Sequence, residues 1–239
     1  EIAIDLGTAN TLIISNDKVV VDEPSIVARD IIQNKIVAIG KKAQQMHGKT
    51  HKTIETIRPL KDGVIADFQA AEQMIRGMIK MIPSRKSIFS PSLKMVICIP
   101  SGITEVEKRA VKDSAEHAGA KEVFLIHEPM AAAIGIGVDV LEPKGNMIID
   151  IGGGTSEIAV ISLGGIVTDK SIKVAGDDFT SDIRMYMKNH HNIDIGERMA
   201  EKIKINVGAA LQDIDDPPPH FAVHGRDLMS GIPKEIIVT

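Results

Sequence analysis

The hydrophobic positions of this chain follow two different periods. In short runs the apolar residues are continuous or alternate, as is typical of β-strands, and residues 94–99 form an almost continuous run that suits an inner strand of a covered sheet. Elsewhere they recur every three or four positions, which predicts amphipathic helices. Asp67 is placed to cap one such helix, and Thr104 with Glu107 forms a capping box for another, which ends at Gly119.

The order of these elements indicates the fold class. A strand over residues 123–126 and a short helix over residues 128–135 continue the order strand, helix, strand, helix, which is the α/β signature. Short β-rich runs before them indicate an antiparallel or mixed sheet. These runs cover residues 11–15, 19–21, 25–29 and 36–39. Later elements are a strand over 166–174, a helix capped by Asp177 or Asp178, a helix from Glu197 through Val207, and strands over 220–224 and 236–238.

One stretch carries candidate chemistry. Residues 147–160 join an apolar run, an acidic residue, three glycines, two hydroxyl residues and a second apolar run, which predicts a β-hairpin. The glycines at 152–154 can take positive φ angles without a Cβ clash, so their N–H groups can converge on one anion, and Thr155 and Ser156 add hydroxyl donors. Asp150 would repel a bare phosphate, so its presence indicates a divalent cation. For this stretch alone, a plain hairpin is the alternative.

A similar pattern lies near the start of the chain. Residues 4–13 repeat the order of strand, Asp, aliphatic residue, Gly, small residues, hydroxyl and strand. The two copies are roughly 145 positions apart, which is a domain-sized interval. Two similar domains facing one cleft would bring Asp5 and Asp150 together around one nucleotide. Neither copy has the glycine spacing of a Rossmann dinucleotide site or of a P-loop.

Together with the segment Ile-His-Glu-Pro-Met-Ala-Ala-Ala at residues 126–133, the two loops resemble the actin, sugar-kinase and heat-shock-chaperone ATPase superfamily. Within it, residues 5–11, 57–67 and 99–109 are similar to the MreB family of bacterial actin-like cell-shape proteins, and the resemblance runs from one end of the chain to the other. The resemblance implies an α/β fold with actin-like (ribonuclease H-like) duplicated α/β domains around a nucleotide cleft.

The implied domains are a first actin-like domain over residues 1–139, with a small inserted subdomain at about 26–67, and a second over 140–239, with a small subdomain at about 209–239. The chain begins inside a strand, and it lacks the Gly-Gly-x-x-Leu adenosine motif and closing helices with which relatives continue. We therefore expect a cut N-terminus and a C-terminally incomplete second domain.

The resemblance also implies the site. Asp5 and Asp150 would hold Mg²⁺ through water, while the two loops cradle the β- and γ-phosphates of ATP or ADP. The implied catalytic residues are Glu128, Thr155 and Asp150, with Glu128 orienting the attacking water. The implied phosphate-binding residues are Gly7, Thr8, Ala9, Asn10, Thr11, Gly152, Gly153, Gly154 and Thr155.

Two of these assignments have simpler alternatives. Glu128 could be an ordinary helix-start carboxylate favoured by the helix dipole, and its neighbour His127 departs from the Glu that is usual in the family. In relatives the helix that starts near residue 197 flanks the adenosine; alternatively, its charges are surface pairs at i,i+4 spacing. ATP rather than GTP is implied by the family alone. The implied adenosine contacts are Glu197, Glu201, Lys202 and Lys204.

Composition argues against several classes of function. The net charge of −4 leaves no basic footprint for nucleic acid. Cys98, the single cysteine, lies in an apolar run, so a buried structural thiol is expected rather than a nucleophile. No apolar run reaches the roughly 18 residues of a spanning helix and no signal peptide opens the chain, so a cytosolic location is expected.

A loop rich in helix breakers, residues 83–91, places Ile88 and Phe89 beside Arg85 and Lys86. The apolar pair could be a buried anchor for the loop. It could equally enter the acyl boundary of a membrane while the basic residues meet anionic head groups. The resemblance to the membrane-binding loop of the MreB family favours the inner face of the cytoplasmic membrane.

The implied function is that of an ATP-binding actin-like protein that polymerises with itself into membrane-associated filaments and organises the cell-wall elongation machinery to maintain rod shape. It would be a slow Mg-dependent ATPase coupled to filament turnover rather than a metabolic enzyme. The alternatives are a small-molecule kinase and a chaperone-type ATPase of the same superfamily. A kinase would need a polar substrate pocket, and a chaperone would need a peptide-binding domain after the ATPase. The sequence shows neither feature.

Overall fold

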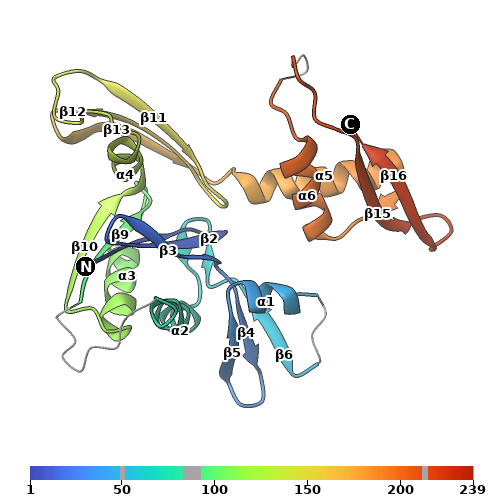
Figure 1. Ribbon diagram of the computed structural model, residues 1–239, viewed down its shortest axis with the longest axis horizontal. Coiled ribbons are helices and arrows are strands. Elements are labelled where there is room, and N and C mark those ends of the chain that lie inside the picture. Colours follow the sequence, from blue (N-terminus) through green and yellow to red (C-terminus); the bar gives the residue numbers. More distant parts are fainter. Residues whose placement is uncertain (49–51, 83–92, 212–214, 239) are drawn as a thin grey trace. The chain divides into compact units, whose positions relative to one another are not determined.

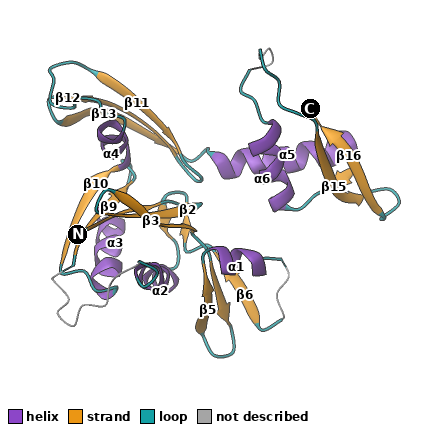
Figure 2. Ribbon diagram, viewed as in Figure 1, coloured by secondary structure: helices purple, strands orange, loops and turns teal. Residues whose placement is uncertain are grey.

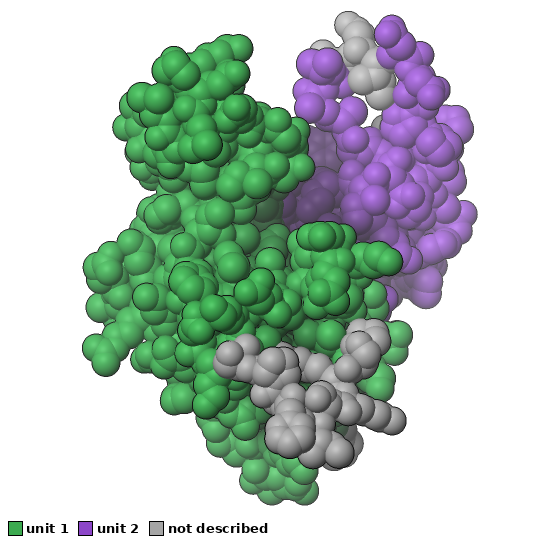
Figure 3. All heavy atoms as spheres, turned by 60° about the vertical axis from the view of Figure 1, so that its left-hand side comes forward, with its two compact units in different colours: residues 1–175 green, residues 176–239 purple. Residues whose placement is uncertain are grey.

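The computed structural model describes residues 1–48, 52–82, 93–211 and 215–238. The chain separates into two compact units, residues 1–175 and residues 176–239 (Figure 3), and each is described by itself. These units are defined by compactness. The domains expected over 1–139 and 140–239, with their small subdomains, remain a prediction.

The first unit is built on a five-stranded mixed sheet (Figure 1). β1 pairs in parallel with β9, and β9 with β10, whereas β1, β2 and β3 form an antiparallel meander. The early strands thus contribute to a mixed sheet, as expected. In the order β10-β9-β1-β2-β3, the bounds are β10 (Glu122–His127), β9 (Lys94–Ile99), β1 (Ile2–Leu6), β2 (Asn10–Ser15) and β3 (Lys18–Pro24).

Two helices, α2 (Phe68–Ile79) and α3 (Glu105–His117), begin where the capping residues predict. The side chain of Asp67 accepts a hydrogen bond from the backbone N–H of Ala70, and Thr104 with Glu107 forms the complete capping box. The helical stripe predicted after Asp67 is confirmed as a buried face, because its apolar residues pack in the main core.

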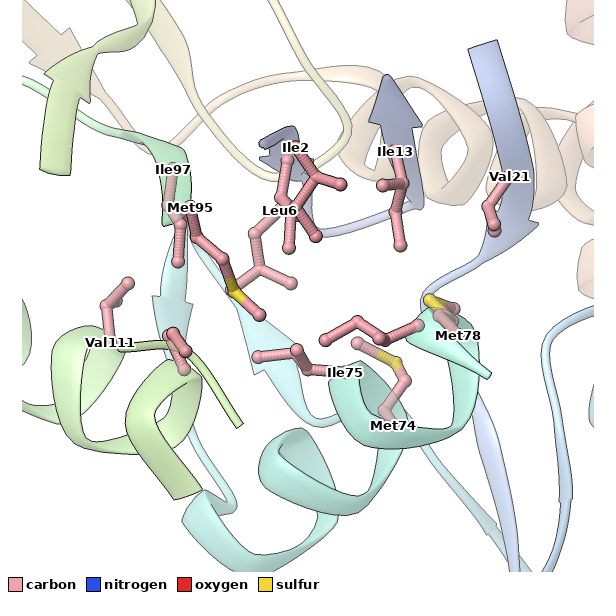
Figure 4. Packing of buried hydrophobic residues seen from close by; sticks show 14 of the residues in the cluster. Ile2, Leu6, Ile13, Val21, Met74, Ile75, Met78, Met95, Ile97 and Val111 are labelled. Carbon is pink, nitrogen blue, oxygen red and sulfur yellow. The ribbon is translucent and has the colours of Figure 1, made fainter. Parts of the chain in front are cut away.

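That core joins the two helices to the sheet (Figure 4). Met74 and Met78 are fully buried, so these methionines are core residues and not a partner groove. Close packing of this kind fixes the sheet on which the first hairpin loop stands. The other labelled members of the cluster are Ile2, Leu6, Ile13, Val21, Ile75, Met95, Ile97 and Val111.

Two small β-structures follow β3 in the chain (Figure 2). One is a three-stranded sheet in the order β5-β4-β6, formed by β4 (Val27–Asp30), β5 (Lys35–Ile39) and β6 (Ile54–Ile57), with α1 (Lys41–Met46) packed on it through Ala43. The other is a tight hairpin of β7 (Leu60–Lys61) and β8 (Val64–Ile65). Its turn residues Asp62 and Gly63 both have positive φ, which matches an Asp-Gly turn of type I′.

The second predicted hairpin is present. β11 (Asn146–Ile151) and β12 (Ser156–Ser162) pair in antiparallel fashion, and β13 (Gly165–Ile172) adds a third strand. The short helix α4 (Glu128–Gly135) packs on this sheet, where Ala133, Ile148 and Ile161 form a small core. The sheet therefore holds the Gly-Gly-Gly turn on a rigid base.

The second unit contains α5 (Gly176–His191), β14 (Ile193–Asp194), α6 (Glu197–Val207), β15 (Phe221–Asp227) and β16 (Pro233–Val238). Its core lies between the two helices and the sheet β14-β15-β16. The expectation that Asp177 or Asp178 caps α5 is wrong, because the helix begins at Gly176 and both carboxylates lie in its first turn. In that turn the helix dipole still stabilises their negative charges. No helix within the described ranges of either unit is long and apolar enough to cross a membrane.

Candidate functional site

The two glycine-containing hairpin loops line one cavity of about 430 Å³ in the first unit. Backbone and side-chain polar groups make up much of its wall, as expected of a site that binds a polar ligand. A larger cavity of about 570 Å³ in the second unit is lined mainly by apolar residues, and none of the predicted site residues lines it. The residues around the first cavity are Asp5, Leu6, Gly7, Thr8, Ala9, Asn10, Leu12, Asp22, Gly63, Glu128, Asp150, Gly152, Gly153, Gly154 and Thr155.

The structure gives a different reason for the glycines at 152–154. We expected positive φ angles, but none of the three has one. They are glycines because there is no room for a side chain: a Cβ on Gly153 would lie 2.7 Å from Cβ of Ala9, and a Cβ on Gly154 would lie 2.9 Å from Oγ1 of Thr8. The second hairpin loop therefore packs directly against the first.

Thr11 is not among the residues that line the cavity. The residue is 1% exposed; its hydroxyl is 2.8 Å from Oγ of Ser25, and the Ser25 hydroxyl donates to the carbonyl oxygen of Gly7 at 2.6 Å. These contacts connect Thr11 and Ser25 to the backbone of the first loop. The predicted phosphate contact of Thr11 itself remains a prediction.

A third loop, which the sequence reasoning missed, closes on the first two. The backbone N–H of Gly63 in the β7–β8 turn donates to Oγ1 of Thr8 at 3.0 Å. A Cβ on Gly154 would lie 3.1 Å from Cα of Asp62, so the turn also touches the second loop. The Asp-Gly dipeptide at 62–63 is a strong hairpin signal, and it could have predicted the turn, although not its position in the site.

Four acidic residues line this cavity from different elements: Asp5 near the end of β1, Asp22 in β3, Asp150 near the end of β11 and Glu128 at the start of α4. Burial and then the charge of Asp150 raise the pKa of Asp5. Burial and then Glu157 raise the pKa of Asp150. The predicted meeting of the two aspartates around one cleft is thus what the structure contains.

Among Asp5, Asp150 and Glu128, the pKa of Glu128 is the most perturbed. Burial first, and then the charges of Asp5, Glu157 and Asp150, raise its pKa to about 8. An ordinary helix-start carboxylate would be solvated and favoured in its charged form by the helix dipole, which lowers a pKa. A strongly perturbed carboxylate in a cleft is typical of a functional site, and the catalytic role of Glu128 remains a prediction.

The donor set fits a hydrated divalent cation. Asp5 and Asp150 repel each other when both are ionised, and a cation between them would remove that cost. In the described part of the chain, no group of three or more His, Cys, Asp or Glu side chains could hold a metal ion directly. A cation held through its water shell by two carboxylates and a ligand is the arrangement that magnesium favours.

Glu157 is a second residue that the sequence reasoning did not single out. It is 1% exposed, and its oxygens accept from the backbone N–H of Ser101 and the hydroxyl of Ser171. It lies directly opposite Asp150 in the hairpin. The sequence did contain a signal for this residue. Glu157 occupies a position of β12 whose alternate neighbours are apolar and face inward.

The predicted adenosine contacts all lie on α6 in the second unit. Glu201 and Lys204 form an ion pair at 2.8 Å with i,i+3 spacing, and Lys204 also donates to the carbonyl oxygen of Gly176 at 2.8 Å. Thr180 of α5 donates to Glu201 at 2.5 Å. These bonds join α6 to the first turn of α5. Glu197 and Lys202 are exposed, and contact of any of the four with adenosine remains a prediction.

Two other sequence predictions concern the apolar pair at 88–89 and the single cysteine. Ile88 and Phe89 fall outside the described residues. Cys98 is half-buried in β9, and burial, followed by the charges of Asp5, Glu128 and Asp150, raises the pKa of its thiol to about 12. Because the thiolate is the nucleophile, such a thiol is inert at neutral pH.

Comparison with solved structures defines the class of protein. The chain superposes on "MreB 5 of Spiroplasma citri bound to AMPPNP" with a TM-score of 0.89 and 41% identity, covering 100% of this chain and 71% of that one. A MamK double helical filament, at 19% identity and a TM-score of 0.75, shares the fold. The chain is an actin-like protein, which confirms the predicted fold class.

The chain belongs to the MreB/Mbl family, whose sequence model, described as "MreB/Mbl protein", matches residues 1–239. It is 48% identical to the cell shape-determining protein Mbl of Bacillus subtilis (strain 168), over 100% of this chain and 71% of that protein. It is 46% identical to the cell shape-determining protein MreB of Escherichia coli (strain K12), over 98% and 68%. The chain is therefore a cell-shape cytoskeletal protein, and the kinase and chaperone alternatives are not favoured.

Proposed function

We propose that the cavity between the two hairpin loops binds ATP and ADP with Mg²⁺. The observation that carries this proposal is the convergence of both glycine loops and two facing aspartates on a single polar cavity. Two solved relatives support it, because the Spiroplasma citri proteins of the same family were crystallised with AMPPNP and with ADP.

In this proposal the phosphates are held mainly by backbone. Residues 7–10 and 152–155 line the cavity, and the N–H groups of residues 7–10, 153 and 154, with the hydroxyl of Thr155, would supply neutral donors. The N–H of Gly152 instead donates to the carbonyl oxygen of Thr155 at 2.9 Å, which holds the turn. Asp5 and Asp150 hold the hydrated Mg²⁺, which would neutralise phosphate charge. Since no covalent intermediate is required, the contribution of the protein is positioning and electrostatics.

Glu128 is proposed to orient the attacking water and to accept its proton. It borders the same cavity as Asp150 and Thr155, the two other residues assigned to catalysis. A general base must be unprotonated, and a pKa of about 8 leaves Glu128 largely protonated at neutral pH unless positive charge enters the site. We therefore expect ATP hydrolysis to be slow and to depend on a cation bound in the site.

We further propose that the chain self-associates into filaments, that these lie on the inner face of the cytoplasmic membrane, and that they organise cell-wall elongation. Self-association is supported by the actin-like fold that the chain shares with the MamK filament. Membrane contact rests on the sequence around Ile88 and Phe89.

Two measurements test the proposal. Isothermal titration calorimetry of the chain with ADP and AMPPNP, with and without Mg²⁺, should show one site that requires the cation. Electron microscopy with ATP and anionic lipid should show filaments. Absence of nucleotide binding in calorimetry would overturn the cavity assignment, whereas binding without filaments would overturn only the assembly step.

A further inference from the structure

Glu157 is a buried acid for which the proposed reaction has no use. It does not line the cavity, so it cannot contact a nucleotide there. Oε2 accepts from the backbone N–H of Ser101 at 3.0 Å, and Oε1 accepts from the hydroxyl of Ser171 at 2.6 Å. These two accepted hydrogen bonds fix the direction of the Glu157 side chain.

This position is unfavourable for folding alone. Glu157 and Asp150 are cross-strand partners, so two carboxylates share one face of the hairpin, where like charges destabilise the pair. The same face of β12 continues with the buried apolar residues Ala159 and Ile161. Among the residues that the structure describes, the hydrogen bonds of Glu157 come from Ser101 and Ser171, and no Lys, Arg or His forms an ion pair with it. A sequence breaks a local packing rule of this kind most often where function requires it.

The charge of Glu157 reaches the cavity. Glu157 is the cross-strand partner of Asp150, and Asp150 borders the cavity together with Asp5 and Glu128. Glu157 therefore adds negative potential behind the wall that faces the ligand, and its hydrogen bonds prevent it from turning away.

We propose that Glu157 is a positioning residue whose fixed, buried negative charge makes nucleotide binding depend on a divalent cation. This rests on the proposed function. Without a cation, a nucleotide's phosphates meet the repulsion of Asp5 and Asp150, increased by Glu157. With Mg²⁺ present, the same charge attracts the cation and favours its binding by the two aspartates. Glu157 thus widens the affinity difference between the nucleotide with Mg²⁺ and the free nucleotide.

The test compares dissociation constants for ADP in Mg²⁺ and in EDTA, measured by calorimetry on the full chain. Glu157→Gln keeps the volume, the acceptor for Ser101 and a partner for Ser171, and removes only the charge. We expect the ratio of the two constants to fall by about tenfold, as for the loss of one partly screened charge at close range. Glu157→Met removes the charge without adding an amide, and it gives the same expectation if the Gln variant folds poorly.

Two controls separate charge from packing. Ser171→Ala removes one hydrogen bond from Glu157 but leaves the charge, so its ratio should match that of the parent. Glu116→Gln removes an exposed acid of α3 and controls for net charge. An unchanged ratio in both Glu157 variants overturns the inference, and so does an equal fall in Ser171→Ala. If the parent fails to bind ADP even with Mg²⁺, the proposed function itself fails, which is a distinguishable result.

Discussion

The backbone N–H of Gly63 donates a 3.0 Å hydrogen bond to Oγ1 of Thr8 from a turn 55 positions away in the chain. The turn is closely packed and requires glycine at this position. Gly63 has a φ of +77°, and a Cβ there would lie 2.9 Å from Cγ of Pro100. Both residues border the cavity. The Asp62–Gly63 turn therefore helps to fix the first hairpin loop.

Thr8→Val should destabilise the chain. Valine has nearly the same shape but no hydroxyl, so the N–H of Gly63 loses its acceptor in a partly buried place, which typically costs about 1–3 kcal/mol. Urea unfolding followed by circular dichroism measures the change in the free energy of unfolding. Thr8→Ser keeps the hydroxyl and is the matched control. Equal stability of the Val and Ser variants would show that the bond does not hold the turn.

Asp150→Ala should abolish binding of the magnesium nucleotide while the fold is retained. Asp150 is half-buried near Asp5, Glu128 and Glu157, so its removal relieves repulsion and does not expose a core. Calorimetry with ADP and Mg²⁺ provides the measurement, and Asp169→Ala, on the exposed strand β13, controls for the loss of one charge. Parent-like affinity in Asp150→Ala would remove the aspartate from the site.

Glu128→Gln should bind nucleotide as the parent does but hydrolyse ATP more slowly. Glutamine keeps the volume and a hydrogen-bonding oxygen, but it cannot accept a proton, and loss of a general base slows a reaction by about 10²–10⁴-fold. Phosphate release under single-turnover conditions is the readout. The exposed residue Glu142, changed to Gln, serves as the control. Equal turnover in the two variants would return Glu128 to a structural role.

The stability of the ligand-free chain should fall as the pH rises towards 8. The pKa of Glu128 is about 8 in the folded chain, against an ordinary value of 4.5, so the folded state binds the proton more tightly than the unfolded state. Between these two values the unfolded chain is ionised and the folded chain is not, so each increase in pH favours unfolding. The raised pKa values of Asp5 and Asp150 act in the same direction.

Melting temperatures measured in EDTA from pH 5 to pH 8 test this. The parent should lose stability across the range, and Glu128→Gln should show a shallower decline because glutamine does not titrate. The same slope in both proteins would mean that Glu128 is not held protonated in the folded chain.

Much of the fold was predictable because local signals agree with tertiary packing. The caps at Asp67 and Thr104, the apolar stripe of α2 and both hairpins appear where the sequence places them. The start of α5 was predicted incorrectly: the helix begins at Gly176, because acidic residues are favourable in the first turn of a helix as well as at its cap.

The site was less predictable, because its contacts join segments far apart in the chain. The predicted meeting of Asp5 and Asp150 came from a repeat, which a single sequence can show. The approach of Gly63 to Thr8, and the burial of Glu157 beside Asp150, depend on packing that no local pattern encodes. For the same reason the glycines at 152–154 were assigned to unusual φ angles when close packing requires them.

The apolar pair Ile88 and Phe89, next to Arg85 and Lys86, leads to a prediction about membranes. Burying each apolar side chain contributes at most about 1.5–3 kcal/mol. Each basic residue adds about 1 kcal/mol on anionic lipid.

A monomer should therefore bind only marginally, whereas a filament that presents many such loops should bind by avidity. Because filaments can sediment unaided, the assay is flotation of vesicles in a density gradient, with and without ATP. It compares the parent with the double variant Ile88→Ser and Phe89→Ser. The parent should float with anionic vesicles when ATP allows assembly, and the variant should assemble but not float with neutral or anionic vesicles. A variant that floats with anionic vesicles as well as the parent would show that the loop is a packed connector and that attachment lies elsewhere in the chain.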